Sequence, residues 1–219
     1  DFVGLTTDKQ RTAETLQTAE IPTPIGLPLA AGASLPLDFP YPAVLKPRDG
    51  AGSQDVAWIE SAAHAGSIAP CATASRLEQF YPGTPASVAA MVSEEHFLLL
   101  PATRQVLSTD GRFTYRGGDN NLTQDHRRRA RDLAYRTLTA LPQTLGYVGV
   151  DMVLGEDACG KGDVVIEVNP RLTTSYVGLL EICRGNLARA MLEIAVGRLP
   201  ELSWRDCLVE FSADGQVKH

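Results

Sequence analysis

The pattern of apolar and polar positions along the chain predicts short strands interrupted by a few helices. The clearest helix spans residues 123–141, where apolar residues recur at helical spacing and Thr123 is a candidate N-terminal cap. Apolar, β-branched runs bounded by turn residues predict strands. The expected strands cover residues 41–47, 56–59, 76–83, 84–93, 96–100, 104–107, 112–118, 147–154, 164–169 and 204–211. The strands in the middle of the chain are expected to form a mixed sheet. Further helices are expected at residues 11–19, within 61–75, and at 177–182 and 186–196, and a surface loop at 26–40.

The strands at 147–154 and 164–169, joined by a glycine-rich turn, carry the most informative polar residues. Alternate residues of a strand share a face, so Glu167 and Asn169 point the same way. Arg171 continues that row if strand geometry persists past Pro170. If the turn pairs the two strands in register, Asp151 lies near Glu167.

Two carboxylates and an amide oxygen are hard ligands that suit Mg²⁺, which takes its remaining ligands from phosphates and water. An arginine at the rim of such a site can stabilise negative charge on a transferred phosphoryl group. The alternative interpretation is a plain hairpin whose polar residues face water. Against it, Glu-x-Asn-x-Arg directly follows a β-branched run, where a solvent-facing strand more often carries Lys or Thr.

A second candidate site lies at residues 41–59, where a short strand ends in Lys46 and a Gly/Ser-rich loop leads into a returning strand. Small residues such as Gly50, Gly52 and Ser53 let backbone N–H groups approach an anion, and Lys46 adds a positive charge. The segment is not a Walker A loop, because it lacks GK[ST] and a strand follows it. A plain hairpin loop is the alternative.

Three further polar groups each allow two interpretations. Tyr115 and Arg116 lie beside a Gly-Gly pair and are either substrate contacts or ordinary edge residues. The hydroxyl-rich turn at 172–176 either binds the acceptor or a phosphate through the next helix N-terminus, or only caps that helix. The arginines of the long helix form either a solvated face or, as the less favoured interpretation, a groove for an anion; they are Arg127, Arg128, Arg129 and Arg131.

Composition narrows the class of protein. The 219 residues fit one large domain or two small lobes, and 44% apolar residues are enough for a core. No apolar run is long enough to span a membrane, no signal peptide is recognisable, and a net charge of −6 argues against a nucleic-acid coat. The four cysteines form no CxxC pair and are interpreted as reduced cytosolic thiols.

Taken together, the segments resemble the ATP-grasp superfamily of carboxylate–amine and carboxylate–thiol ligases, which includes biotin carboxylase and D-alanine–D-alanine ligase. The resemblance rests on Asp8-Lys9 at a helix start, Lys46 with its loop, the run 78–81, and Asp151 followed by Glu-Val-Asn-Pro-Arg at 167–171. Within the superfamily, the resemblance is closest to the carboligase-like branch, which includes archaeal-type ligases that join an amine to a glutamate.

The resemblance implies an α+β fold in which two α+β lobes hold a nucleotide between them. Residues 1–77 would form the N-terminal or lid lobe, residues 78–211 the C-terminal lobe with the metal site, and residues 212–219 a polar, mobile tail. Members of the superfamily usually carry a further α/β domain before the Asp-Lys segment, and this chain is expected to lack it, which would leave the enzyme incomplete.

The resemblance also implies residue roles. Glu78 would accept a hydrogen bond from the exocyclic amine of adenine, while Gln79 and Tyr81 would lend backbone groups. In many relatives a ribose-binding glutamate stands where this chain has Pro85, so no ribose contact is assigned. The full expected nucleotide site is Lys9, Lys46, Gly50, Gly52, Ser53, Glu78, Gln79 and Tyr81. The metal, Mg²⁺ or alternatively Mn²⁺, would be held by Asp151, Glu167 and Asn169, and Arg171 would be catalytic.

The implied function is an ATP-dependent ligase that activates a carboxylate as an acyl phosphate for attack by an amine, in cofactor biosynthesis for instance. Its partners would be small-molecule carboxylates and amines, with neither nucleic acid nor membrane involved. The expected location is the cytoplasm, and a homodimer is compatible with the sequence. The competing hypothesis is a non-catalytic or regulatory ATP-binding module. The retained Asp, Glu, Asn and Arg argue against that alternative, because binding alone has little need of all four.

Overall fold

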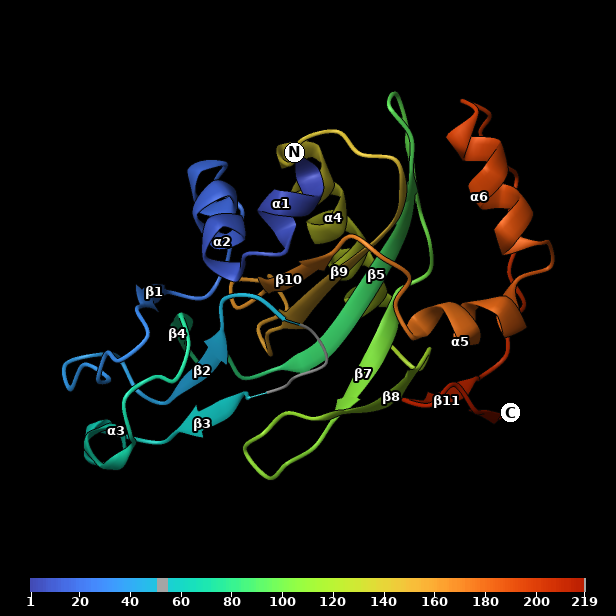
Figure 1. Cartoon of the computed structure of the whole chain (residues 1–219). Helices are drawn as coiled ribbons and strands as arrows, with labels where there is room; N and C mark the ends of the chain where they lie inside the picture. The colour runs from blue at the N-terminus through green and yellow to red at the C-terminus, as the bar shows by residue number, and fades with distance from the viewer. Residues whose placement is uncertain (51–54, 219) are drawn as a thin grey trace.

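The computed structural model describes residues 1–50 and 55–218, and within them the chain forms two sheets with helices on their faces (Figure 1). The smaller sheet has the strand order β1-β4-β2-β3. Its strands are β1 (Gly26–Leu29), β2 (Ala43–Pro47), β3 (Ala57–Ile59) and β4 (Ser75–Gln79), with helix α3 (Ala62–Ser67) beside β3. Its core is an apolar cluster that includes Ala43, Ile59 and Leu77.

The larger sheet has the order β10-β9-β5-β7-β8-β11-β12, with β6 paired to β5. Its strands are β5 (Thr84–Val92), β6 (Phe97–Leu99), β7 (Thr103–Leu107), β8 (Tyr115–Asp119), β9 (Gly146–Leu154), β10 (Val164–Asn169), β11 (Glu210–Ser212) and β12 (Val217–Lys218). Among the described residues every strand pair of both sheets is antiparallel. The expectation of a mixed sheet is therefore wrong.

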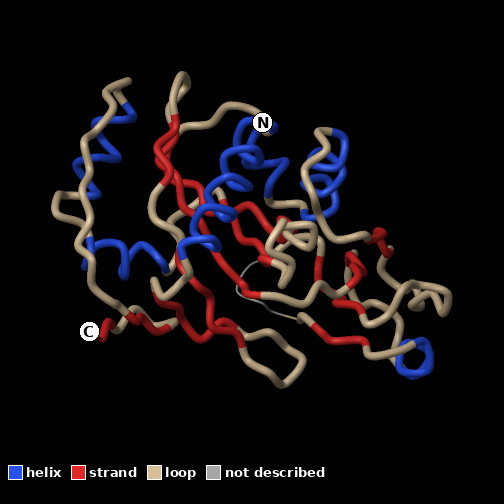
Figure 2. The backbone as a smooth tube through the Cα atoms, turned by 180° about the vertical axis from the view of Figure 1, so that it is seen from behind, coloured by secondary structure: helices blue, strands red, loops and turns tan. Residues whose placement is uncertain are grey.

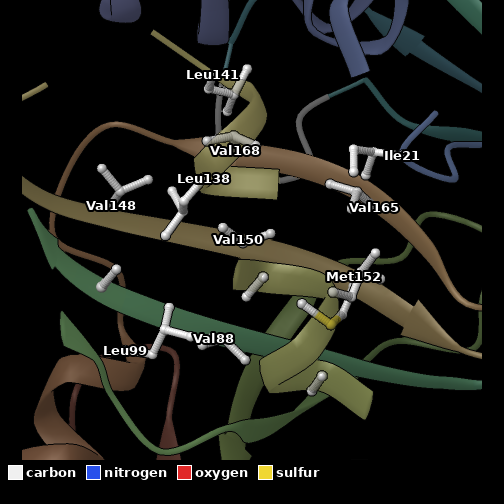
Figure 3. Packing of buried hydrophobic residues seen from close by; sticks show 14 of the residues in the cluster. Ile21, Val88, Leu99, Leu138, Leu141, Val148, Val150, Met152, Val165 and Val168 are labelled. Carbon is white, nitrogen blue, oxygen red and sulfur yellow. The ribbon is translucent and has the colours of Figure 1, made fainter. Parts of the chain in front are cut away.

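Helix α4 (Gln124–Ala140) covers one face of the larger sheet, as Figure 2 shows from behind. The Thr123 side chain caps it by accepting a hydrogen bond from the His126 N–H at 3.1 Å, as the sequence predicted. The apolar stripe of α4 packs onto alternate residues of β9, such as Val150 and Met152, and onto β5 (Figure 3). Because side chains alternate along a strand, Asp151 points to the opposite face.

Helices α5 (Ser175–Ile182) and α6 (Leu187–Ala195) lie on that opposite face, on the right of Figure 1. They bury Leu179, Leu187 and Ile194 against Met91 and Tyr147 of the sheet. The larger sheet is thus covered by helices on both faces. Within the described residues, no helix combines the length and apolar character that crossing a lipid bilayer needs.

The two N-terminal helices, α1 (Phe2–Thr6) and α2 (Lys9–Thr18), pack against the larger sheet, although the smaller sheet follows them in sequence. Phe2, Leu5 and Leu16 join the same apolar cluster as α4 and β9. The expected lobe boundary between residues 77 and 78 falls inside β4 and stays a prediction.

Several element predictions need correction. Residues 26–40 do not form only a loop, because β1 pairs with β4 there. The closing strand begins at Glu210 rather than 204, since Trp204 makes only an isolated bridge with Cys183. Val217 and Lys218 of the polar tail pair with β11, and the expected mobility of the tail stays a prediction. Helix α1 was not predicted.

Candidate active site

The candidate metal ligands stand in one row across three strands. Asp151 of β9 is the register partner of Ser87 on β5 and of Glu167 on β10, where a bulge between Val165 and Glu167 re-aims the strand. Directly opposed residues of antiparallel strands project their side chains from the same face. The structure therefore brings Asp151 and Glu167 together, as the sequence predicted.

Asp151 is the most unusual group of this row. The residue keeps some exposed surface, but its Oδ1 is buried and has no hydrogen-bond partner among the described residues. Burial first, and then the negative charge of Glu167, raise the pKa of Asp151 to about 6; Ser87, Gln105 and Arg171 oppose the rise. Ser87 and Gln105 favour the charged form of Asp151, although neither side chain forms a hydrogen bond with it in the described structure. The Ser87 hydroxyl is itself buried and has no partner there.

Asn169 links Asp151 to Arg171. Its Nδ2 donates to Asp151 Oδ2 at 3.0 Å, and its Oδ1 accepts from Arg171 Nη2 at 3.0 Å. Arg171 is exposed and also donates to the Leu172 carbonyl at 3.3 Å. The expected catalytic arginine is thus oriented by the expected metal ligand beside it. The Asn169 oxygen has a second lone pair left for a cation.

Lys9 sits at the first position of α2, where Asp8 caps the helix by accepting from the N–H groups of Gln10 and Arg11. The Lys9 ammonium lies 3.3 Å from Glu167 Oε1 and donates to the Gly50 carbonyl at 2.9 Å. Arg48 Nη2 reaches Asp8 Oδ2 at 2.5 Å. The loop after β2 is therefore fastened to the helix start beside Glu167.

Lys46 also reaches the site, but its charge is already paired. Its ammonium lies 2.5 Å from Glu78 Oε1 and 3.5 Å from the carbonyl of Ile166 on β10. Both Lys46 and Glu78 are buried. The carboxylate expected to receive adenine is thus paired with the lysine expected to receive phosphate.

Arg76 is the site residue to which the sequence assigned no role. It is 1% exposed, and its Nε donates to Glu78 Oε2 at 3.1 Å. Its other nitrogens donate to Gln10 Oε1 at 2.5 Å and to the Pro24 carbonyl at 2.9 Å. The signal available in the sequence was an arginine two residues before a glutamate in the same short strand, so that both side chains share a face.

Gly26 makes room for this arginine. A Cβ built on Gly26 would lie 2.7 Å from Arg76 Nη2 and 2.7 Å from the Leu77 carbonyl, closer than real contacts allow. The strand β1 therefore needs glycine at this position in order to pair with β4 over the buried guanidinium.

A family model described as the ATP-grasp domain matches residues 6–175, a range that contains every one of these groups. The chain belongs to the ATP-grasp family. That membership accounts for the two-sheet architecture.

Known proteins similar to this ATP-grasp chain include tyramine–L-glutamate ligase of Methanocaldococcus jannaschii, 31% identical over 104 residues, which are 47% of this chain and 31% of that protein. The structure of biotin carboxylase from Campylobacter jejuni matches with a TM-score of 0.75 at 16% identity, over 94% of this chain and 50% of that one. L-amino acid ligase from Bacillus licheniformis matches with a TM-score of 0.72 at 20% identity, over 90% and 49%. This chain thus spans about half of these structures and about a third of the curated relative.

In this ATP-grasp chain the segment after β4 connects the two sheets. The Gln79 N–H donates to the Ile25 carbonyl at 2.8 Å, so only its other groups remain for a ligand. Tyr81 is half-buried, and its backbone makes no hydrogen bond to other described residues. Phe80 is half-buried and packs edge-on to Trp58, with ring centroids 4.6 Å apart.

Two expected phosphate contacts, Gly52 and Ser53, lie outside the described residues, whereas Gly50 lies within them with φ +105°. Burial and the charge of Asp151 raise the pKa of the Tyr115 hydroxyl. At the hydroxyl-rich turn, Thr174 precedes α5 without a side-chain capping bond, and Thr173 Oγ1 lies 2.9 Å from Ser175 Oγ. Capping by Thr174 therefore does not explain that turn.

The ATP-grasp family implies a divalent metal ion, and the residues present fit one. Mg²⁺ prefers hard oxygen donors. The site offers the buried Asp151 Oδ1, which has no hydrogen-bond partner among the described residues, and the Glu167 carboxylate, whose charge raises the pKa of Asp151. The third donor is the Asn169 amide oxygen. The cavity that Lys9, Glu78 and Glu167 line has a volume of only about 10 Å³, room for about one water molecule.

Proposed function

We propose that this chain forms the nucleotide-binding part of an ATP-dependent ligase, which activates a small-molecule carboxylate as an acyl phosphate for attack by an amine. The observation that carries the proposal is the unpartnered, buried Oδ1 of Asp151, set beside Glu167 and Asn169 and linked through Asn169 to Arg171. Such an arrangement costs stability in the absence of ligands, and a cation with phosphate oxygens would offset that cost.

In the proposed reaction a carboxylate oxygen of the substrate attacks the γ-phosphorus of ATP, and the bond from that phosphorus to the β,γ-bridging oxygen breaks to release ADP. The amine nitrogen then attacks the carbonyl carbon of the acyl phosphate, the carbon–oxygen bond to phosphate breaks, and the nitrogen loses a proton to solvent. Both steps depend mainly on positioning and on neutralising negative charge. A magnesium ion held by Asp151, Glu167 and Asn169 would supply positive charge to the phosphate oxygens, with Mn²⁺ as an alternative.

The chain's own cations would do the remaining work. Lys9 and Lys46 would leave their carboxylate partners for phosphate oxygens, while Arg76 keeps the Glu78 charge neutralised in the interior. Glu78 Oε1, once released, could accept a hydrogen bond from adenine, and the free backbone of Tyr81 could contact the same ring. Arg171, held by Asn169, would bind the transferring phosphoryl group.

The names of similar proteins support the carboxylate–amine class, since tyramine–L-glutamate ligase and L-amino acid ligase both join such groups. We extend that substrate class to this chain, without naming a particular carboxylate or amine. A cytoplasmic location, a role in cofactor biosynthesis and a homodimer remain predictions from the sequence.

Thermal melting with ATP and Mg²⁺, followed by an assay for ADP, tests the proposal. We expect ATP with Mg²⁺ to raise the melting temperature, and a pool of carboxylates and amines to give ADP. Arg171→Ala should keep the melting shift and lose about a hundredfold or more of ADP formation, as loss of a transition-state contact does. No shift in the wild type would contradict any nucleotide site. A shift without ADP from any pool would favour the alternative, a non-catalytic ATP-binding module.

Replacing Lys46 separates phosphate binding from adenine binding. Lys46→Met keeps the aliphatic stem and leaves Glu78 paired with Arg76, so the fold should persist. We expect its affinity for ATP to fall about tenfold or more, as loss of a charge-assisted hydrogen bond does, with little change for adenosine. Calorimetric titration measures both, and Lys161→Met, at an exposed loop lysine, is the matched control. Equal losses for ATP and adenosine would remove Lys46 from the phosphate site.

A further inference from the structure

A large hollow of the described structure lies away from the acidic row. It is a groove of about 560 Å³, within the size range of small-molecule sites. Helix α4 forms one wall, the turn between β8 and α4 another, and the extended segment 204–208 the third. We call it the arginine groove, after Arg127, Arg131 and Arg205, which line it together with Asn121, Trp204 and Asp206.

The arginine run of α4 divides between two environments. Arg129 is buried and pairs with Asp163, and it also donates to the Gly155 carbonyl at 2.7 Å. Arg128 pairs with Asp125 at 2.7 Å and with Asp132 at 3.5 Å. These two arginines are explained by the fold. The other two, Arg127 and Arg131, point into the arginine groove.

Positive charge in the groove is not balanced within the described residues. Three arginines and one carboxylate, that of Asp206, line it, in a chain whose net charge is −6. The Arg131 side chain makes no hydrogen bond or ion pair with any described residue, and among those residues the Arg127 side chain donates only to the Asn120 carbonyl at 3.1 Å. Like charges four residues apart on a helix repel each other. An anion bridging Arg127 and Arg131 would remove that repulsion.

The groove also offers an apolar surface. The Trp204 ring is half-buried, and the buried residues Ala102 and Ile182 lie beside it in the same lining. The Trp204 backbone is fixed by its bridge to Cys183 and by Arg184 Nε, which donates to the Trp204 carbonyl at 3.3 Å. A fixed aromatic ring beside guanidinium groups suits a flat ligand that also carries negative charge.

The arginine groove is separate from the acidic row. The residues that line it include none of those in the candidate active site, such as Asp151, Glu167 or Asn169. Asn120, just after β8, also lines the groove, and its side chain binds the backbone of Cys207 and Val209. A ligand here would therefore not compete with ATP for any group of the candidate active site.

We propose that the arginine groove is a second binding site, for a small organic anion that carries at least two negative charges and a flat apolar part. The guanidinium groups of Arg127, Arg131 and Arg205 bind its charged oxygens, and Trp204 covers its flat part. The proposal stands independently of the ligase activity.

Tryptophan fluorescence tests it directly, because the chain has two tryptophans and Trp58→Phe leaves Trp204 as the reporter. The probes are benzene-1,3,5-tricarboxylate, pyrophosphate and uncharged benzamide. We expect the tricarboxylate to change the emission of Trp204 saturably, pyrophosphate to bind more weakly, and benzamide to give no saturable change. In the same background, Arg127→Gln/Arg131→Gln should weaken tricarboxylate binding about tenfold or more. Arg128→Gln, one residue away and outside the lining, should leave it unchanged.

Both replaced arginines are exposed, so the double variant should fold, and circular dichroism checks this. Arg205→Gln, on the opposite wall, gives a second and independent variant with the same expected loss. Absence of saturable tricarboxylate binding would overturn the proposal, as would equal binding by the wild type and the charge-removed variants. If pyrophosphate binds as tightly as the tricarboxylate, recognition of a flat apolar part is overturned.

Discussion

Replacing Asp151 by asparagine is expected to stabilise the ligand-free protein and to abolish its response to Mg²⁺ and ATP. The carboxylate is ionised at neutral pH although one of its oxygens is buried without a hydrogen bond and a second carboxylate lies opposite. An amide keeps the Asn169 contact through its oxygen and can donate toward the unpartnered Ser87 hydroxyl. Stability and metal binding should therefore change in opposite directions.

The size and pH dependence follow from the pKa of Asp151. Folding raises it from 3.8 to about 6, so the folded protein binds the proton more tightly than the unfolded chain does. This carboxyl therefore destabilises the fold progressively as the pH rises from about 4 to about 6, and by a constant amount above that. Because the residue keeps some exposure, we expect Asp151→Asn to gain about 1–3 kcal/mol at pH 7.5 and less at pH 5.

Thermal or denaturant unfolding at pH 7.5 and pH 5, with and without Mg²⁺ and ATP, measures these effects. Glu167→Gln is the matched control, because it removes a carboxylate from the same row that is partly exposed and paired with Lys9. It should lose the response to Mg²⁺ and ATP without the gain in stability. An Asp151→Asn protein that is less stable than the wild type, or that still binds Mg²⁺ and ATP normally, would contradict the assignment.

Replacing Arg76 by methionine is expected to destabilise the protein by about 3–5 kcal/mol, the range seen when one partner of a buried ion pair is removed. The guanidinium is 1% exposed and donates to Glu78, Gln10 and the Pro24 carbonyl. Methionine fills a similar volume but leaves those acceptors without a donor in the interior. Lys46 would then carry the whole neutralisation of Glu78 and would be less free to bind phosphate.

A double-mutant cycle separates this network from simple loss of packing. Because Arg76 and Glu78 contact each other, Arg76→Met/Glu78→Gln should cost about 1–3 kcal/mol less than the sum of the single variants. Arg128→Met, which breaks an exposed pair with Asp125, is the control and should cost about 1 kcal/mol or less. Strictly additive effects of Arg76→Met and Glu78→Gln would show that the ion pair is not coupled.

Short-range patterns in the sequence were enough for much of the fold. Thr123 and the apolar stripe after it specified α4, because capping and helical spacing act within a few residues. The apolar, β-branched runs at 147–154 and 164–169 predicted β9 and β10, and the turn between them favoured a register in which Asp151 lies near Glu167, as the structure has it. The order of motifs pointed to the ATP-grasp family.

The long-range pairings were decided by the tertiary structure. Nothing within a few residues of Arg76 indicates that Gln10 and Pro24 will bind its guanidinium, or that Gly26 must leave room for it. Lys46 reaches Glu78 because β2 pairs with β4, and it meets Ile166 only where the two sheets come together. Long-range pairing also decided the different environments of the α4 arginines, because Asp163 lies beside Arg129 only after β10 has paired with β9. Charges are neutralised by whichever groups the packed chain brings within reach, and sequence spacing alone does not contain that information.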